Sequence, residues 1–383
     1  MQKIKYLDGL RGLAALFVVF SHFVVAFYPA LYTSDVSQIH TAKAVELDIA
    51  KSPLNLLYNG NFAVCIFFVL SGYVLSYKFF STKDNETLVA SAVKRYFRLL
   101  VPIFFTVFLV FLLMKCSLFS NTEAGKLSFS EWWLGTFWNF DESFLHAIKY
   151  ATFEAIFEYN DQYNTVLWTM TYEMYGSFLV FGFVSLFGKT RNRYLFYILI
   201  IILFFKTYYL AFILGMILSD LNSNGYFNKT SKNLGWFKMI LLALGLYLGS
   251  YPMGAVVDDS IYNYIKVVDL QGVIIYHIVG ALLVMLVLLN SVKLQEFFSY
   301  RVFNFLGKVS FSLYLIHVIV IGSFTSYIFV LLNERMAYSI SVFISIILSI
   351  PLLAILSYLM YKYVDKKGIE ISGKLYNRFF KQN

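Results

Sequence analysis

The chain has 383 residues, of which 59% are hydrophobic, 20% aromatic and 14% charged. A chain of this composition would expose a large apolar surface to water, which excludes a soluble globular protein. The formal net charge is +9, and in a membrane protein the placement of Lys and Arg indicates orientation, so we expect a polytopic membrane protein that binds no nucleic acid.

The apolar segments predict an all-α bundle of about ten transmembrane helices, because a span needs roughly 20 apolar residues to cross about 30 Å of hydrocarbon. We interpret the first segment as a retained helix, since Asp8 and Arg11 interrupt its apolar run and no small-residue cleavage site follows. Eight clear candidates lie at residues 7–28, 60–78, 97–115, 165–187, 236–251, 271–290, 309–332 and 338–361.

The region of residues 193–221 is long for one helix and contains Lys206. A turn at Lys206 leaves most Lys and Arg residues in loops on one side, whereas a single helix would move the later cationic loops to the opposite side. The positive-inside rule therefore predicts two short helices here and both termini in the cytoplasm. We expect a transmembrane domain over residues 1–365 and a basic cytoplasmic tail over residues 366–383, in the cytoplasmic (inner) membrane of a bacterium.

Two long loops, residues 29–59 and 116–164, are expected on the outer side of the membrane. The second loop contains Trp132, Trp133 and Trp138. These side chains fit an aromatic belt at the membrane interface, or a surface on which a sugar stacks. Both interpretations place aromatic groups above the outer face.

Two histidines and both cysteines give little indication of a functional site. His40 and His146 are expected to be ordinary solvated residues. Cys65 and Cys116 are the only cysteines, and they provide neither a disulfide framework nor a thiolate metal site.

The first apolar segment carries two ionisable groups, Arg11 and His22. Eleven residues are close to three helical turns, so both side chains share one face, about 16 Å apart along the axis. Ionisable groups in hydrocarbon are costly unless they face protein or water, so we expect both to face the bundle interior. Either Arg11 pairs with Asp8 and His22 only joins two helices, or the two residues line a cavity with an anion-binding entrance and a proton-accepting imidazole.

Five segments together resemble, in order, the motifs of the acyltransferase family 3 membrane proteins. Lys94 and Tyr73 depart from the Arg and Phe usual in that family. The resemblance implies transfer of an acyl group, usually acetyl from acetyl-CoA, to a hydroxyl of a cell-surface or lipid-linked carbohydrate. It implies acetyl-CoA as a cosubstrate, membrane lipids as surroundings, no permanently bound cofactor and no metal. The segments are LDGLRGLAALFVVFSHF at 7–23, FFVLSGYVLS at 67–76, KRYFRLLVP at 94–102, LWTMTYE at 167–173 and FSLYLIH at 311–317.

The matched motifs suggest a donor site at the cytosolic mouth. Arg11, Arg95 and Arg98 would bind the phosphates of CoA, because guanidinium groups form paired hydrogen bonds with phosphate oxygens. Arg95 and Arg98 would otherwise be positive-inside flanks only. Ser71 and Gly72 would let another helix or the CoA arm approach closely, and a covalent Ser71 is disfavoured because the spacing implies no adjacent base.

The chemical step is expected at His22, which would act as general base and remove the proton of the acceptor hydroxyl. Estimated depths bring Glu173 and His317 near the same level. Glu173 would orient the acceptor or the imidazole. His317 is either a further catalytic group or a core histidine hydrogen-bonded to Tyr314 or to a backbone carbonyl.

Trp168 and Tyr314 are candidate acceptor-binding residues, and His277 could join the same cluster. Two other classes of function compete with acyl transfer. A glycan transporter or flippase would use the buried charges for coupling, although no internal repeat supports it. A noncatalytic scaffold would leave Arg11, His22 and Glu173 without a role.

Overall fold

A computed structural model gives the fold and describes residues 4–141, 143–227, 235–267 and 269–380. In this part of the chain the regular structure is entirely helical. It contains seven helices that are long and apolar enough to cross a membrane, so the chain forms a multi-pass helical bundle. Their segments are α1 (Lys5–Phe27), α4 (Gly60–Thr82), α5 (Glu86–Lys115), η6 (Thr165–Leu167) with α9 (Trp168–Phe187), α14 (Leu270–Leu289), α16 (Arg301–Val320) with α17 (Ser326–Asn333), and α18 (Tyr338–Met360) with α19 (Lys366–Phe380).

Three shorter apolar helices accompany them: α10 (Arg193–Leu203), α11 (Tyr209–Ser223) and α13 (Gly235–Gly249). The predicted turn at Lys206 is confirmed, because α10 ends before it and α11 begins after it. The backbone of Lys206 has a φ of 67°, and its ammonium binds Asp269 at 3.1 Å. The total of ten crossings stays a prediction, since an eleven-residue helix is only about 16 Å long.

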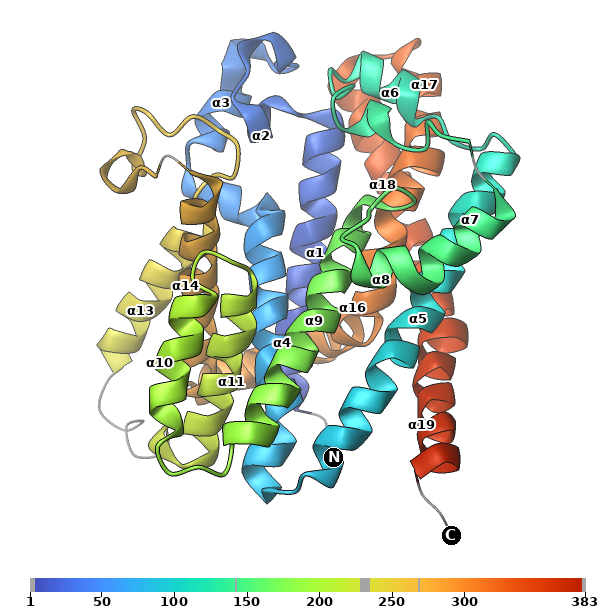
Figure 1. Ribbon diagram of the computed structural model, residues 1–383. Coiled ribbons are helices and arrows are strands. Elements are labelled where there is room, and N and C mark those ends of the chain that lie inside the picture. Colours follow the sequence, from blue (N-terminus) through green and yellow to red (C-terminus); the bar gives the residue numbers. More distant parts are fainter. Residues whose placement is uncertain (1–3, 142, 228–234, 268, 381–383) are drawn as a thin grey trace.

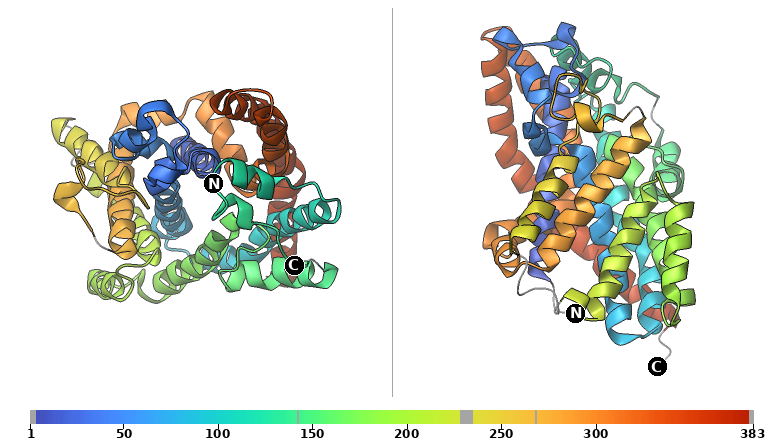
Figure 2. Two further views of the ribbon diagram at one scale, coloured as in Figure 1. Left: turned by 90° about the horizontal axis from the view of Figure 1, so that it is seen from above. Right: turned by 90° about the vertical axis from the view of Figure 1, so that its left-hand side faces the viewer.

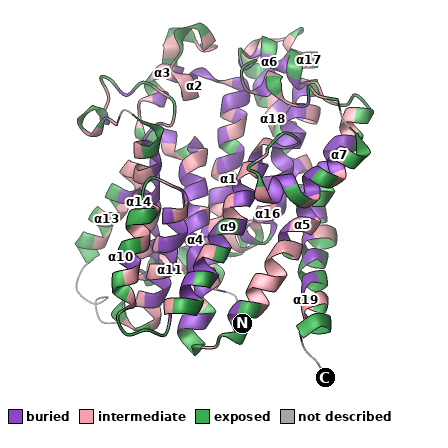
Figure 3. Cartoon of the chain, in the orientation of Figure 1, coloured by how far each residue is buried: buried purple, intermediate pink, exposed green. Residues whose placement is uncertain are grey.

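Helices α1 and α4 form the centre of the bundle, and close approaches at glycine hold their neighbours. Helix α1 packs against α16, and α4 packs against α11. A Cβ on Gly12 would lie 2.5 Å from the Gly307 nitrogen, and a Cβ on Gly72 would lie 2.0 Å from the Phe212 carbonyl oxygen. Only glycine permits such backbone contact between helices in a membrane. Seen from above, other helices surround this centre (Figure 2), and exposed residues concentrate on peripheral helices such as α10 and α13 (Figure 3).

The segment expected to be a basic tail is largely helical. A π-turn, η9 (Tyr361–Asp365), continues α18 into α19, and α19 packs along α5. The Lys94 ammonium lies 4.5 Å from the centre of the Tyr376 ring across this contact. The start of α1 and the end of α19 lie at the same end of the bundle (Figure 1), so α19 can contribute side chains to whatever site opens there.

The two long loops contain short helices. They are α2 (Ala30–Thr33), η1 (Val36–Gln38), η2 (Ala42–Ala44), α3 (Val45–Ala50) and η3 (Pro53–Tyr58) in the first loop, and α6 (Asn121–Leu127), η4 (Leu134–Thr136), α7 (Phe144–Lys149), η5 (Tyr150–Glu154) and α8 (Ala155–Phe157) in the second. The short helices of the first loop and α6 of the second cover the opposite end of the bundle, whereas α7 and α8 lie along its side beside α5 and α9 (Figure 1). Ser130 of the second loop donates a 2.7 Å hydrogen bond to the Val25 carbonyl of α1. Both loops are therefore packed onto the bundle.

His40 joins the two loops, so the expectation that it is solvated is wrong. Its ring lies between those of Phe129 and Tyr338, with a centroid distance of 3.7 Å to Tyr338. Its Nε2 donates a 3.0 Å hydrogen bond to the Ser128 carbonyl. Burial lowers the pKa of His40 below its ordinary value, because a charged imidazole loses hydration there.

Helix α15 (Val292–Phe298) and the short η7 (Asn263–Ile265) lie near the two ends of α14, and a π-turn, η8 (Ile321–Thr325), joins α16 to α17. Both cysteines, Cys65 and Cys116, are free thiols. Neither therefore contributes a covalent cross-link to the bundle.

Candidate active site

Two cavities lie within the bundle. The cavity that we call the histidine cavity has a volume of about 210 Å³ and is lined by His22, Asn61, Trp133, Trp168 and Tyr208, among others. The second, which we call the arginine cavity, has a volume of about 370 Å³ and is lined by Arg11, Arg95, Arg98, Glu173, Lys308 and Lys366, among others. Their lining residues overlap at Val64 and Tyr314. The predicted site residues are thus divided between two adjoining chambers.

His22 on α1 contacts His317 on α16, which brings together two of the three residues predicted for the chemical step. Nδ1 of His22 lies 2.7 Å from Nε2 of His317, and the ring centroids are 4.9 Å apart. His317 has no exposed surface, and its Nδ1 lies 3.0 Å from the carbonyl oxygen of Leu313. The buried ring is therefore held at both nitrogens.

These contacts fix the tautomers of the two neutral rings. The Leu313 carbonyl can only accept, so Nδ1 of His317 carries a hydrogen and Nε2 of His317 is an acceptor. Nδ1 of His22 must then donate to it, which leaves Nε2 of His22 without a hydrogen. In the described part of the chain, no hydrogen bond to this Nε2 is present. His22 thus carries an available lone pair, which a general base requires.

The second long loop covers the His22 ring. The Trp133 ring is nearly parallel to the imidazole, with centroids 5.3 Å apart and planes 11° apart. Trp132 also lines the histidine cavity. The membrane-belt interpretation is wrong for Trp138, which is buried, stacks on Phe119 and donates to the Tyr163 carbonyl at 2.9 Å. Two of the three tryptophans therefore face a cavity and one is a core residue.

Amide and phenol groups also line the histidine cavity. Asn61 donates to Nδ1 of His277 at 2.6 Å, and the Tyr208 hydroxyl donates to the Asn61 side-chain oxygen. Nε2 of His277 donates to the Tyr251 carbonyl at 2.9 Å. His277 therefore orients Asn61 and does not contact His22. Trp168, predicted to contact the acceptor, lines the histidine cavity.

Cationic groups dominate the arginine cavity. Arg11 pairs with Asp8 at 3.0 Å, as one interpretation of the sequence predicts, yet it also faces the cavity. Arg98 makes no hydrogen bond or ion pair with residues that the structure describes. The three predicted arginines thus occur together, at the end of the bundle where the chain begins and ends.

Glu173 belongs to the arginine cavity and lies apart from the histidine pair. Its carboxylate binds the Arg95 guanidinium and accepts a 2.7 Å hydrogen bond from Ser71. The prediction that Glu173 orients the imidazole is not supported by this placement. The reason is direction: Thr169 and Glu173 are four residues apart on α9 and share the face that lines the arginine cavity. A depth in the membrane similar to that of the histidines therefore did not bring Glu173 into contact with them.

Of the residues predicted to hold the CoA arm, Ser71 lines the arginine cavity and Gly72 does not. Gly72 instead faces the α11 backbone. Ser71 donates to the Glu173 carboxylate, which Arg95 already holds, and no imidazole bonds the Ser71 hydroxyl among the described residues. The arrangement gives no support to a nucleophilic Ser71.

Several cavity residues were not predicted from the sequence. Lys308 and Lys366 add two cations to the arginine cavity, and Asn61 and Tyr208 add polar groups to the histidine cavity. Lys308 lies three residues before the motif at 311–317, which was the only available signal. Among the described residues, no group of three or more His, Cys, Asp or Glu side chains is placed to hold a metal ion.

The chain is similar to known proteins over most of its length. The family model described as an acyltransferase domain matches residues 4–356. The chain is similar to Acyltransferase clz18 of Cochliobolus lunatus, with 24% identity over 389 positions that cover 83% of each protein. It is similar to O-acetyltransferase PaAT-1 of Phomopsis amygdali, with 23% identity over all of this chain and 86% of that protein. It is also similar to Acyltransferase R4 of Phoma sp., with 22% identity over 83% of each. No solved structure matches the chain.

Proposed function

Because the chain belongs to this family of membrane acyltransferases, we propose that it transfers an acetyl group from acetyl-CoA to a hydroxyl of a cell-surface or lipid-linked carbohydrate. One observation carries the proposal: a cationic cavity and a cavity with an unprotonated imidazole nitrogen adjoin at Tyr314. The termini lie in the cytosol, and the acceptor arrives from the other side. The relatives are fungal, and the bacterial inner membrane stays a prediction.

The arginine cavity is the donor site in this proposal. CoA carries phosphates, and Arg98, Lys308 and Lys366 offer them cationic donors that hold no carboxylate through any ion pair among the described residues. Arg11 and Arg95 each bind one carboxylate, but a guanidinium has five N–H groups and keeps several for a phosphate. Acetyl-CoA is a cosubstrate here, and no permanently bound cofactor is needed.

The histidine cavity is the acceptor site. Trp132, Trp133 and Trp168 present aromatic rings to it, and Asn61 presents an amide. Aromatic faces pack against the apolar face of a sugar, and amides hydrogen-bond its hydroxyls. The lining side chains include no Asp, Glu, Lys or Arg. These features favour an uncharged, hydroxyl-rich acceptor.

The reaction follows from the tautomers of the histidine pair. Nε2 of His22 takes the hydroxyl proton as the acceptor oxygen forms a bond with the thioester carbonyl carbon. The carbon–sulfur bond then breaks, and the thiolate of CoA receives the proton from the His22 imidazolium. While His22 is charged, its Nδ1 hydrogen remains bonded to Nε2 of His317, which stabilises the cation. Both rings end in their starting tautomers.

The direct test is acetyl transfer in membranes that contain the protein and its native acceptor, with labelled acetyl-CoA as donor. The variant His22→Ala should lower the rate by about 10²- to 10⁴-fold, the usual contribution of a general base. The matched control is His146→Ala, which removes a histidine outside both cavities. Full activity of His22→Ala would refute the assignment, and substrate movement without acetyl transfer would favour a transporter.

A further inference from the structure

The partition between the two cavities is a structural feature that the proposed function leaves unexplained. The lining residues of the histidine cavity include no arginine, and those of the arginine cavity do not include His22. A thioester held in the arginine cavity is therefore separated from Nε2 of His22 by the residues between the two cavities. The two linings share Val64 and Tyr314, so these residues form the partition.

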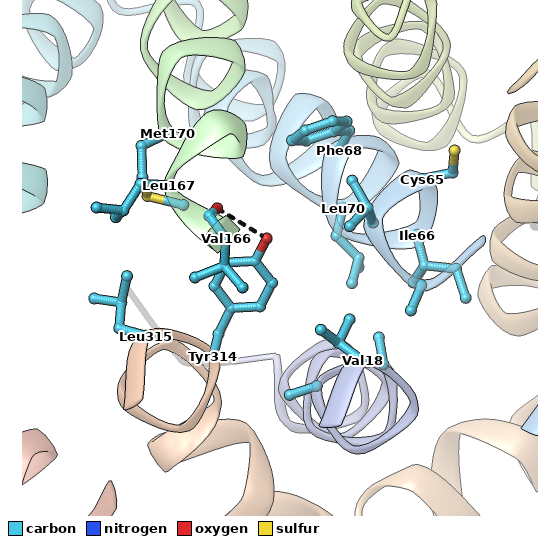
Figure 4. Packing of buried hydrophobic residues seen from close by; sticks show 14 of the residues in the cluster. Val18, Cys65, Ile66, Phe68, Leu70, Val166, Leu167, Met170, Tyr314 and Leu315 are labelled. Carbon is cyan, nitrogen blue, oxygen red and sulfur yellow. Dashed lines mark hydrogen bonds between the residues drawn. The ribbon is translucent and has the colours of Figure 1, made fainter. Parts of the chain in front are cut away.

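Tyr314 projects from α16 toward the start of α9, as Figure 4 shows. Its hydroxyl lies 2.9 Å from Thr169 Oγ1 and 3.2 Å from the Val166 carbonyl oxygen. Thr169 donates its own hydrogen to Val166 at 2.8 Å, so the Tyr314 hydrogen is directed to Thr169 Oγ1, with the Val166 carbonyl as a second acceptor. Val166 lines the histidine cavity and Thr169 the arginine cavity.

The hydrogen bonds of the Tyr314 side chain thus all involve its hydroxyl. The backbone beside it is anchored separately, because Asn164 donates to the Leu315 carbonyl at 2.7 Å. Phe67 packs edge-on against the Tyr314 ring, with centroids 5.9 Å apart. Rotation of the Tyr314 side chain would break the hydroxyl contacts and the ring packing against Phe67 and His317. It would leave the hydrogen bond from Asn164 to the α16 backbone in place.

From this geometry we propose that Tyr314 is a gate, which closes the passage between the cavities at rest and turns aside to let the acyl-pantetheine arm reach His22. A permanently open aqueous passage would let ions and protons cross the membrane, whereas an apolar constriction excludes water. Tyr314 is a positioning residue in this proposal and takes no proton. The inference rests on the proposed function for its purpose, but the barrier itself can be tested without any acyl transfer.

The test measures access of a membrane-impermeant maleimide, applied outside intact cells, to single cysteine reporters. Cys65→Ala and Cys116→Ala remove the native thiols, and Val25→Cys or Val74→Cys then places a reporter in the histidine or the arginine cavity. With Tyr314 intact, one reporter reacts and the reporter beyond the partition stays protected. Which one reacts depends only on the orientation of the chain in the membrane.

The protected reporter should become reactive when Tyr314 is changed. Tyr314→Phe keeps the ring and loses the hydroxyl contacts, so labelling should accelerate about fivefold, the equivalent of one net hydrogen bond. Tyr314→Ala should accelerate it further. Tyr150→Phe is the matched control, because its hydroxyl bonds the Asn160 carbonyl at 2.9 Å and the residue lines neither cavity. It should leave the labelling of both reporters unchanged.

Equal labelling of both reporters with Tyr314 intact, or a protected reporter unaffected by Tyr314→Phe and Tyr314→Ala, would overturn the gate. If Tyr314→Ala fails to accumulate, Tyr314→Phe decides. A second readout separates the two proposals: opening should speed acetyl-CoA hydrolysis to acetate and CoA in the absence of acceptor. If the Tyr314 variants label faster but no variant consumes acetyl-CoA, the gate is supported and the assignment of acetyl-CoA as donor is refuted.

Discussion

Replacement of His317 tests the role of the histidine pair in stabilising the charged base. In His317→Ala, Nδ1 of His22 loses the acceptor that lies 2.7 Å away. His317 has no exposed surface, so the contact itself lies away from bulk water. The His22 tautomer is then no longer fixed, and the imidazolium that forms during the reaction loses a partner.

The size of the effect follows from that one contact. A hydrogen bond to a charged group contributes about 1.5–3 kcal/mol, which corresponds to a decrease in kcat of about 10- to 150-fold. The KM for acetyl-CoA should change little, because His317 does not line the arginine cavity. His317→Gln supplies an amide oxygen at a similar reach and should recover most of the lost rate.

The assay is release of CoA thiol in membranes that contain the native acceptor. Protein amount and thermal stability are measured alongside, because removal of a buried ring also leaves a cavity that destabilises the bundle. An unchanged kcat in His317→Ala would refute the reasoning. So would a His317→Gln variant no more active than His317→Ala at equal protein amount.

Three further predictions concern other residues. Arg98→Ala should raise the KM for acetyl-CoA by about tenfold or more, since a charge-assisted hydrogen bond to phosphate is lost, and Arg98→Lys should raise it less. Initial rates measured against donor concentration check this, and an unchanged KM contradicts it. Trp133→Ala should lower kcat about two- to twelvefold, which corresponds to the loss of an aromatic pair of about 0.5–1.5 kcal/mol. Trp133→Phe should keep a kcat closer to that of the parent. Equal rates in both variants would show that the stack on His22 has no role. Because burial lowers the pKa of His40, the unfolded chain takes up more protons there as pH falls below about 6.5, so acidification destabilises the fold. Thermal unfolding from about pH 7 to about pH 5 should therefore show a smaller loss of stability in His40→Phe than in the parent, and identical pH dependence would contradict this.

The helices and the broad class of the protein could be predicted because both depend on local properties. Apolar runs located most of the helices, and the charge of Lys206 located the turn between α10 and α11. The course of the chain after Met360 was less accessible. Hydropathy falls there, which predicted a tail, but the helix continues through η9 into α19, which packs along α5 with the buried Gly368 against Val101.

The groups within the site could be predicted only in part. Arg11, Arg95 and Arg98 were expected together and share one cavity, since each lies near the same end of its helix. The pair His22 and His317 joins residues 295 positions apart, so it depends on the rotation of α16 against α1, which no local pattern gives.

The direction of the Glu173 side chain could not be predicted either. Its depth along α9 was estimated near that of the histidines, but its side chain points to Arg95 and Ser71. The direction of a side chain around a helix axis is decided by the neighbouring helices. Motif resemblance named the polar residues and could not assign them to two separate chambers.

The central claim is that the donor enters from the end that holds the termini and meets the acceptor at the Tyr314 partition. The most direct measurement is cryo-electron microscopy of the protein in lipid nanodiscs with CoA bound. The account predicts the phosphates beside Arg98 and Lys366 and the thiol directed toward Tyr314. CoA bound in the histidine cavity, or held at a site that touches neither Arg98 nor Lys366, would contradict it.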